Sequence, residues 1–116
     1  MMIRITITAL VLAVAVCGAS AHAMLEHASP PVGSTAQKAP ARLTLTFTEP
    51  LEAAFSGATV HNSAGQRVDT GARASGSTLQ ISLKPLPSGT YKVNWRVLSV
   101  DTHRTEGRYS FRVGGR

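Results

Sequence analysis

Several kinds of residue are scarce in this chain, and each shortage excludes a class of protein. Cysteine occurs once in 116 residues, which excludes an intrachain disulfide framework and a cysteine-rich zinc site. Charged residues make up 16% and hydrophobic residues 43%, a composition too apolar for a disordered tail. After the N-terminal region no continuous apolar run is long enough to span a bilayer. Acidic residues are also few, 6 against 12 Lys and Arg, which leaves a formal net charge of +6.

The N-terminal segment has the pattern of an export signal. Residues 1–4 form a short basic start, and residues 5–16 are almost wholly apolar. This run is too short for a membrane-spanning helix and is typical of the apolar core of a signal peptide. The small residues at 19–21 predict cleavage before His22, and a second small-x-small triplet offers an alternative start at Met24.

Cleavage before His22 would divide the chain into a leader, residues 1–21, and one domain, residues 22–116. Lipid attachment at Cys17 is the alternative, but Val16 is larger than the small residue expected before a lipidated cysteine. The domain would lack cysteine and would depend on its core alone, for which its size is sufficient. The basic residues are scattered along the sequence, so we predict no nucleic-acid partner. We interpret the charge as favouring solubility and weak attraction to anionic surfaces.

The rest of the chain alternates apolar and polar residues with a period of two, as short β-strands do. Strands are predicted around residues 43–47, 58–61, 66–69, 79–83, 91–97 and 109–113. We predict a short turn within 51–55, a loop over 71–77, and Trp95 as the large aromatic of the core. Six or seven short strands separated by Gly and Pro turns predict an all-β fold, an antiparallel β-sandwich or small barrel.

One pair of residues, just after the strongest predicted strand, could carry chemistry. Asp101 and His103 are two apart, a spacing that places both side chains on one face of an extended backbone. Such a pair is most often a surface ion pair. If export leaves His22 first, however, its α-amine and ring nitrogen could chelate a metal, with His103 adding a nitrogen and Asp101 an oxygen. This donor set suits Cu(II), although zinc also accepts these donors.

Five segments of the sequence resemble one known family. They read HAML at 22–25, ASPPVGS at 28–34, LTFTEPL at 45–51, SGTYKVNWRV at 88–97 and SVDTH at 99–103. Together they are similar to the CopC family of periplasmic copper-binding, copper-resistance proteins, over essentially all of residues 22–116. The resemblance implies a Greek-key β-sandwich of about seven strands, of immunoglobulin or cupredoxin-like type.

The resemblance also implies a site and its setting. It implies one Cu(II) per chain, held by His22 through its amine and ring, by Asp101 and by His103. Glu49 matches an acidic residue near that copper, as a weak axial ligand or an outer group, although it could equally be a charge at the start of a turn. The implied protein is a periplasmic monomer, and the implied partner is an inner-membrane copper transporter of the CopD type.

The sequence departs from part of the family in one respect. Some members carry a second, methionine-rich Cu(I) site, since thioethers are the soft donors that Cu(I) prefers. From His22 onward this chain has one methionine, Met24, so we predict a Cu(II) site only. We predict that His61 is a surface residue at a strand end, and that His27 is exposed or locally hydrogen-bonded.

We expect a binding protein rather than an enzyme. The amine and two imidazoles also occur in copper oxygenases, but these need an open equatorial position, which Asp101 would fill here. The chain is also short for a wide substrate-binding face. A third hypothesis is a metal-free structural sandwich, which predicts weak Cu(II) binding that is unaffected when Asp101 or His103 is replaced by alanine.

Overall fold

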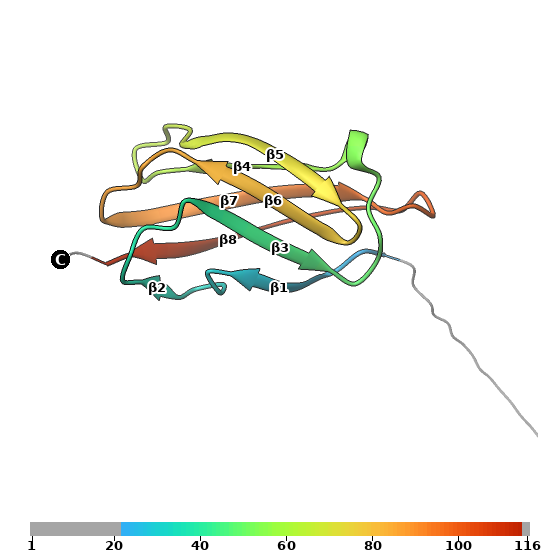
Figure 1. Cartoon of the computed structure of the whole chain (residues 1–116), viewed down its shortest axis with the longest axis horizontal. Coiled ribbons are helices and arrows are strands. Elements are labelled where there is room, and N and C mark those ends of the chain that lie inside the picture. Colours follow the sequence, from blue (N-terminus) through green and yellow to red (C-terminus); the bar gives the residue numbers. More distant parts are fainter. Residues whose placement is uncertain (1–21, 115–116) are drawn as a thin grey trace, which may run out of the picture.

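The computed structural model describes residues 22–114, so the predicted leader at 1–21 lies outside the described residues. Within them the chain forms eight strands and one short 3-10 helix, η2 (Ala53–Phe55) (Figure 1). The strands are β1 (Leu25–Ser29), β2 (Thr35–Ala36), β3 (Arg42–Phe47), β4 (Gly57–His61), β5 (Asp69–Ser75), β6 (Thr78–Leu83), β7 (Gly89–Leu98) and β8 (Arg104–Val113). No helix in this part of the chain is long and apolar enough to cross a membrane.

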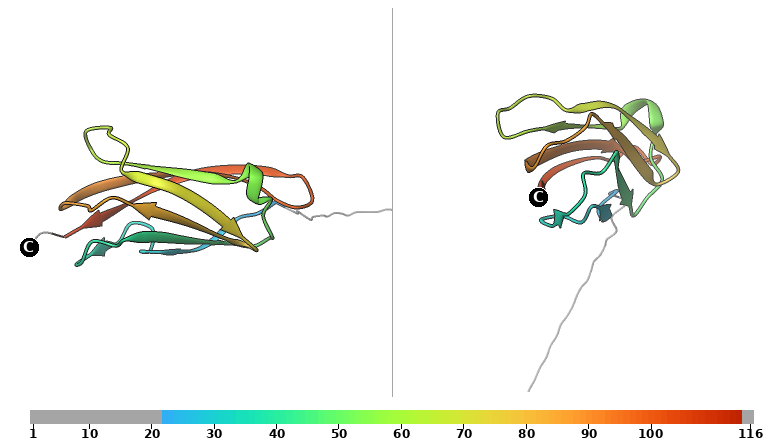
Figure 2. Two further views of the ribbon diagram at one scale, coloured as in Figure 1. Left: turned by 45° about the horizontal axis from the view of Figure 1, so that its top comes forward. Right: turned by 60° about the vertical axis from the view of Figure 1, so that its left-hand side comes forward.

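The strands form two four-stranded sheets that pack face to face (Figures 1 and 2). One sheet has the order β1-β3-β6-β5 and is called sheet A here; the other has the order β2-β8-β7-β4 and is called sheet B. The β2–β8 pairing is parallel, whereas the other strand pairs are antiparallel. The predicted β-sandwich is therefore confirmed, with one short parallel pairing at an edge.

Alternating side chains fill the space between the sheets, as the period of two requires. On β7 the inward positions are Tyr91, Val93, Trp95 and Val97, all buried. The Trp95 ring meets the Phe47 ring of sheet A edge to face, with centroids 5.1 Å apart. Trp95 is 9% exposed, which confirms the predicted core role. Burial of these apolar side chains is the main stabilising contribution to the fold.

The structure corrects the prediction for residues 66–77. The strand predicted at 66–69 is reduced to an isolated bridge between Arg67 and His61 at the end of β4. β5 begins at Asp69, pairs with β6, and continues through most of the segment predicted as a loop. Its small side chains carry little hydrophobic signal, and its regularity comes from backbone pairing with β6. β1 and β2 also lie outside the predicted strands. The predicted short turn within 51–55 is confirmed as η2.

Candidate metal centre

A tight turn between β7 and β8 carries the Asp101–His103 pair. The Ser99 amide donates to the His103 carbonyl over 2.9 Å, and the Thr102 amide donates to the Ser99 carbonyl over 2.8 Å. Thr102 has φ = 70°, in the left-handed region that non-glycine residues rarely adopt. The backbone reverses here, so the extended geometry that the two-residue spacing suggested is not what brings the pair together.

The turn nevertheless brings the two side chains into contact. His103 Nδ1 lies 3.4 Å from Asp101 Oδ1, and both side chains are about half exposed. At this separation the nitrogen and the oxygen are close enough to face one metal ion, since two ligands each about 2 Å from an ion are roughly 3–4 Å apart. The predicted proximity is therefore observed, and its cause is the folded turn.

Ser99 forms hydrogen bonds with both Asp101 and His103. It is fully buried, and its hydroxyl donates to Asp101 Oδ1 while accepting from the His103 amide over 3.2 Å. The Ser99 hydrogen bond lowers the pKa of Asp101, and the hydrogen bond and charge of His103 add to this effect. Partial desolvation opposes it. The Asp101 carboxylate is therefore anionic at neutral pH, the state in which an aspartate binds a metal.

Hydrogen bonds on two sides hold the segment that begins at His22. The Thr105 hydroxyl donates to the Ala23 carbonyl over 2.7 Å. On the other side, the Met24 amide donates to the Thr48 hydroxyl, and the Thr48 amide donates to the Met24 carbonyl, each over 2.9 Å. Ala23 between them is fully buried. The segment is therefore fixed between the end of β3 and the start of β8.

This anchoring places the ring of His22 beside that of His103. The ring centroids are 4.9 Å apart and the ring planes are tilted by 44°. A nitrogen ligand lies about 2 Å from a bound metal, so two nitrogens on one ion are roughly 3–4 Å apart. Small rotations of two exposed rings would bring their nitrogens to that separation. The ring of His22 thus lies beside that of His103, and His103 in turn contacts Asp101.

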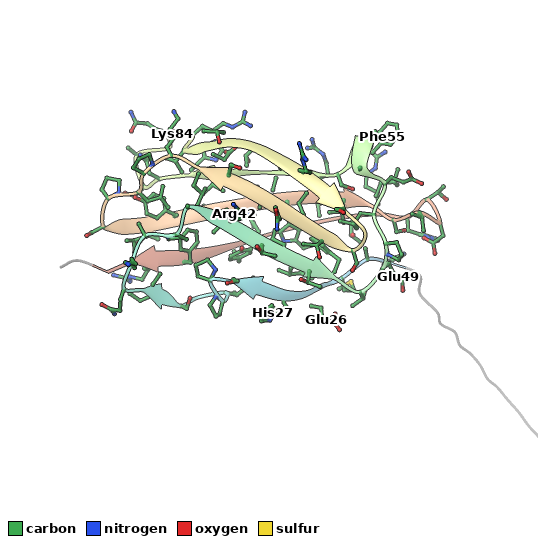
Figure 3. All side chains as sticks on the ribbon, in the orientation of Figure 1. Glu26, His27, Arg42, Glu49, Phe55 and Lys84 are labelled. Atoms are coloured by element: carbon green, nitrogen blue, oxygen red, sulfur yellow. The ribbon has the colours of Figure 1, made fainter. Side chains whose placement is uncertain are left out.

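The remaining predicted residues lie at different distances from this cluster. Glu49 is half-buried in the bend after β3, at the end of the sandwich where the described chain begins (Figure 3). The hydroxyl of the preceding residue, Thr48, donates to the His22 carbonyl over 3.4 Å. Glu49 is therefore next in sequence to a residue that touches His22, and its role at a metal stays a prediction. His27 is exposed on β1 beside Glu26. His61 ends β4 and is half-buried, as a residue at a strand end.

Side chains alone do not complete a metal site in this chain. Among residues 22–114 no group of three or more His, Cys, Asp or Glu side chains has an arrangement that could hold a metal ion. The set predicted from the sequence differs from such a group because one donor is the α-amine of His22. In the unprocessed chain that nitrogen is part of a peptide bond and cannot serve as an amine ligand.

Three residues that hold the cluster together were missed by the sequence analysis as functional positions. Ser99 stands inside the quoted SVDTH segment, so its position beside Asp101 was a usable signal. Thr48 stands inside the quoted LTFTEPL segment, but nothing in that segment indicates its contact with the His22 carbonyl, 26 positions away. Thr105 gave no signal, because the Ala23 carbonyl that it contacts is 82 positions away. Only strand pairing brings such residues together.

Comparisons with known proteins identify relatives of this chain. Residues 25–114 match the family model of the CopC domain. The chain is 37% identical to "Copper resistance protein C" of Xanthomonas campestris pv. juglandis, over 96% of this chain and 94% of that protein. It is 39% identical to "Protein YobA" of Escherichia coli K12, over 80% of this chain and 79% of that protein.

Two solved structures share the fold at similar identity. The crystal structure of CopC from Methylosinus trichosporium OB3b superposes with a TM-score of 0.77 at 33% identity, covering 81% of this chain and 95% of that one. PcoC, described as a methionine-rich copper resistance protein from Escherichia coli, superposes with a TM-score of 0.72 at 34% identity, covering 81% of this chain and 100% of that one.

Proposed function

Because this chain belongs to the CopC family of copper-binding, copper-resistance proteins, we propose that it sequesters or carries one Cu(II) ion in the periplasm. Association with copper follows from the family itself. What we propose beyond this is that the copper is Cu(II), that one ion binds per chain, that the protein works in the periplasm, and which residues are the ligands. The observation that carries it is the 4.9 Å separation of the His22 and His103 rings, at a segment anchored by buried Ala23.

In this proposal export processing creates the strongest part of the site. Removal of residues 1–21 frees the amine of His22, which closes a chelate ring on the metal with the imidazole of the same residue. His103 supplies the third nitrogen, and Asp101 supplies an oxygen and offsets one positive charge. Glu49 serves as a weak axial or outer group.

The scarcity of thioethers supports a Cu(II) site without a second Cu(I) site. The chain has three methionines, two of them at positions 1 and 2, whereas PcoC is described as methionine-rich. Cu(I) prefers soft sulfur ligands, while imidazole, amine and carboxylate suit Cu(II). We therefore propose that this protein does not transfer copper internally between sites of different oxidation state. We also propose that it acts as a monomeric binding protein, not a catalyst, which passes copper to a CopD-type transporter.

The test uses protein isolated after export, with its first residue identified by intact mass. Cu(II) affinity is measured by competition with a chelator, and the number of nitrogen ligands by electron paramagnetic resonance. We expect a chain starting at His22, and a loss of affinity of 100-fold or more, on the order of 3 kcal/mol, when His103→Ala removes one nitrogen. His27→Ala is the matched control, since it removes an exposed histidine that lies on β1.

Extension of the N-terminus by two residues gives a second test that leaves every side chain in place. We expect it to weaken Cu(II) binding strongly, because it converts the amine into a peptide nitrogen. A mature chain that begins at Met24, or equal affinities for the His103→Ala and His27→Ala variants, would contradict the proposed ligand set.

A further inference from the structure

The outer face of sheet B gathers an unusual share of the positive charge. Five basic side chains point outward from β7 and β8, and all are exposed. They are Lys92, Arg96, Arg104, Arg108 and Arg112, and we call this surface the basic face. Glu106 is the one acidic residue that β7 and β8 add to this face, and it lies opposite Arg96 in the strand register. Five positive charges against one negative give the two strands a net outward charge of +4.

The opposite face of the sandwich has no comparable charge. The strands of sheet A present Arg42, Arg73 and Glu26 outward among Thr, Ser and Gln, for a net charge of +1. The basic residues that appear scattered in the sequence are thus gathered on one side, because even-numbered positions of β7 and β8 all point the same way. Within residues 22–114 none of the five side chains forms an ion pair.

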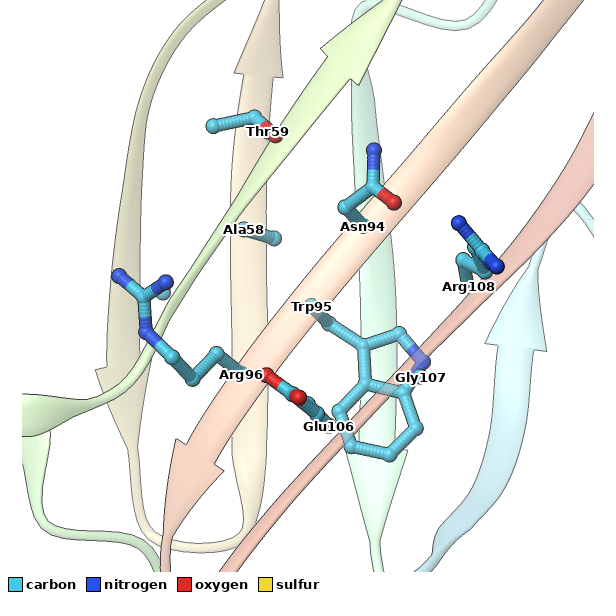
Figure 4. A pocket seen from close by; sticks show the side chains of 9 residues that line it. Ala58, Thr59, Asn94, Trp95, Arg96, Glu106, Gly107 and Arg108 are labelled. Atoms are coloured by element: carbon cyan, nitrogen blue, oxygen red, sulfur yellow. The ribbon is translucent and has the colours of Figure 1, made fainter.

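The basic face is broad and open. Residues four apart on a strand are separated by about 13 Å, so the row at 104, 108 and 112 extends over roughly 26 Å. A shallow depression of about 460 Å³ crosses this face, with the Arg96 and Arg108 guanidinium groups on opposite sides of it and Asn94 on its wall (Figure 4). An open, wide distribution of cations matches an extended anionic surface better than a single small anion.

An exposed aromatic residue stands at the edge of the same face. Phe55 is 64% exposed on η2, immediately before the edge strand β4. It lines a second, smaller depression together with Arg96 and Arg104. An apolar ring beside arginines is the combination that peripheral proteins use at a bilayer surface, where the ring enters the headgroup region and the cations meet lipid phosphates.

We propose that the basic face, with Phe55 at its edge, docks this protein on a bilayer of anionic phospholipid. Because β8 begins with Arg104 immediately after the turn that carries His103, docking would hold the metal-site end of the molecule close to the bilayer. An acidic segment of a protein is the rival partner, but it would need only part of so broad a face. This inference goes beyond the proposed function and does not require copper to be bound.

The test is cosedimentation of metal-free exported protein with vesicles of phosphatidylethanolamine and phosphatidylglycerol, with phosphatidylcholine vesicles for comparison. We expect binding to the anionic vesicles only, weakened by salt. Arg96→Gln and Arg104→Gln each remove one positive charge from the basic face, and each should lower the partition coefficient about fivefold. Phe55→Ser should lower it about tenfold. All proteins are compared with the same N-terminus, so any contribution of residues before His22 cancels.

Matched controls separate a specific face from overall charge. Arg42→Gln with Arg73→Gln removes the same charge from sheet A, and Val32→Ser removes a side chain that is 56% exposed in the loop before β2, at the other edge of sheet B. Both should leave the partition coefficient unchanged. The proposal is overturned if the sheet A pair weakens binding as much as the basic-face pair. It is also overturned if the protein does not bind anionic vesicles, whether or not it binds polyglutamate, the probe for an acidic protein segment. Unchanged thermal unfolding shows that every variant is folded.

Discussion

Replacing Gly107 by alanine would put a methyl group inside the space that the Trp95 indole occupies. Gly107 lies opposite Trp95 in the β7–β8 register, on the inner side of sheet B. A Cβ at position 107 would be 2.4 Å from Trp95 Cζ2 and 2.8 Å from Cε2, whereas ordinary contacts begin near 3.4 Å. The rigid ring would therefore have to move by about 1 Å, and the Phe47 ring behind it leaves little room.

The expected cost follows from this overlap. Overpacking a close-packed core costs about 1–3 kcal/mol, and a clash with a rigid aromatic ring places this substitution at the upper end. For a domain of this size, a loss of about 3 kcal/mol lowers the unfolding midpoint by 12 °C or more. Urea unfolding followed by Trp95 fluorescence measures the free energy of unfolding directly, and thermal unfolding followed by circular dichroism checks the shift in midpoint.

Two further variants make the measurement decisive. Gly57→Ala is the matched control: Gly57 lies in the same sheet, and a Cβ added there meets nothing within 4 Å, so stability should change by less than about 0.5 kcal/mol. In a Trp95→Leu background, Gly107→Ala should lose most of its cost, because the indole it displaces is gone. Urea unfolding is followed there by circular dichroism, since the chain's single tryptophan has been replaced. A free energy of unfolding for Gly107→Ala within about 0.5 kcal/mol of the unmodified protein would refute the reasoning.

Three other predictions concern polar side chains that form hydrogen bonds within the fold. Desolvation alone would raise the pKa of Asp69, but hydrogen bonds from the Arg67 guanidinium and the Val60 amide outweigh it and lower that pKa. The contribution of Asp69 to stability is therefore complete above its unfolded pKa, about 3.9, and is lost as the pH falls through the lower pKa of the folded state. Urea unfolding at pH 5 and pH 3 should show a smaller decline for Asp69→Asn. Thr105→Val removes the hydrogen bond to the Ala23 carbonyl and should weaken Cu(II) binding about tenfold in chelator competition, with little change in fold by circular dichroism. Ser99→Ala removes the support of the site carboxylate and should cost 10–100-fold in the same assay; unchanged affinity would show that this support is dispensable.

Local patterns in the sequence were sufficient for the class of fold. Alternation over 91–97 predicted a strand with one buried face, and β7 buries those same side chains. The failure at β5 has a physical cause, since a strand of small residues is stabilised by backbone hydrogen bonds to a neighbour, and such bonds leave little trace in hydropathy. Asp101, His103 and His22 were named first from spacing and donor chemistry and then from a resemblance, whereas Glu49 was named from the resemblance alone; the structure places the first three close together.

By itself the sequence determined which side chains face inward and which donor types are present, because residue type and two-residue periodicity are local properties. Only the tertiary structure decided that His22 lies beside His103, that a turn with a left-handed Thr102 joins Asp101 to its partner, and that the basic residues of β7 and β8 share one surface. These facts depend on which strands pair and in what register. Pairing between distant segments is set by packing of the whole core, which no short stretch of sequence contains.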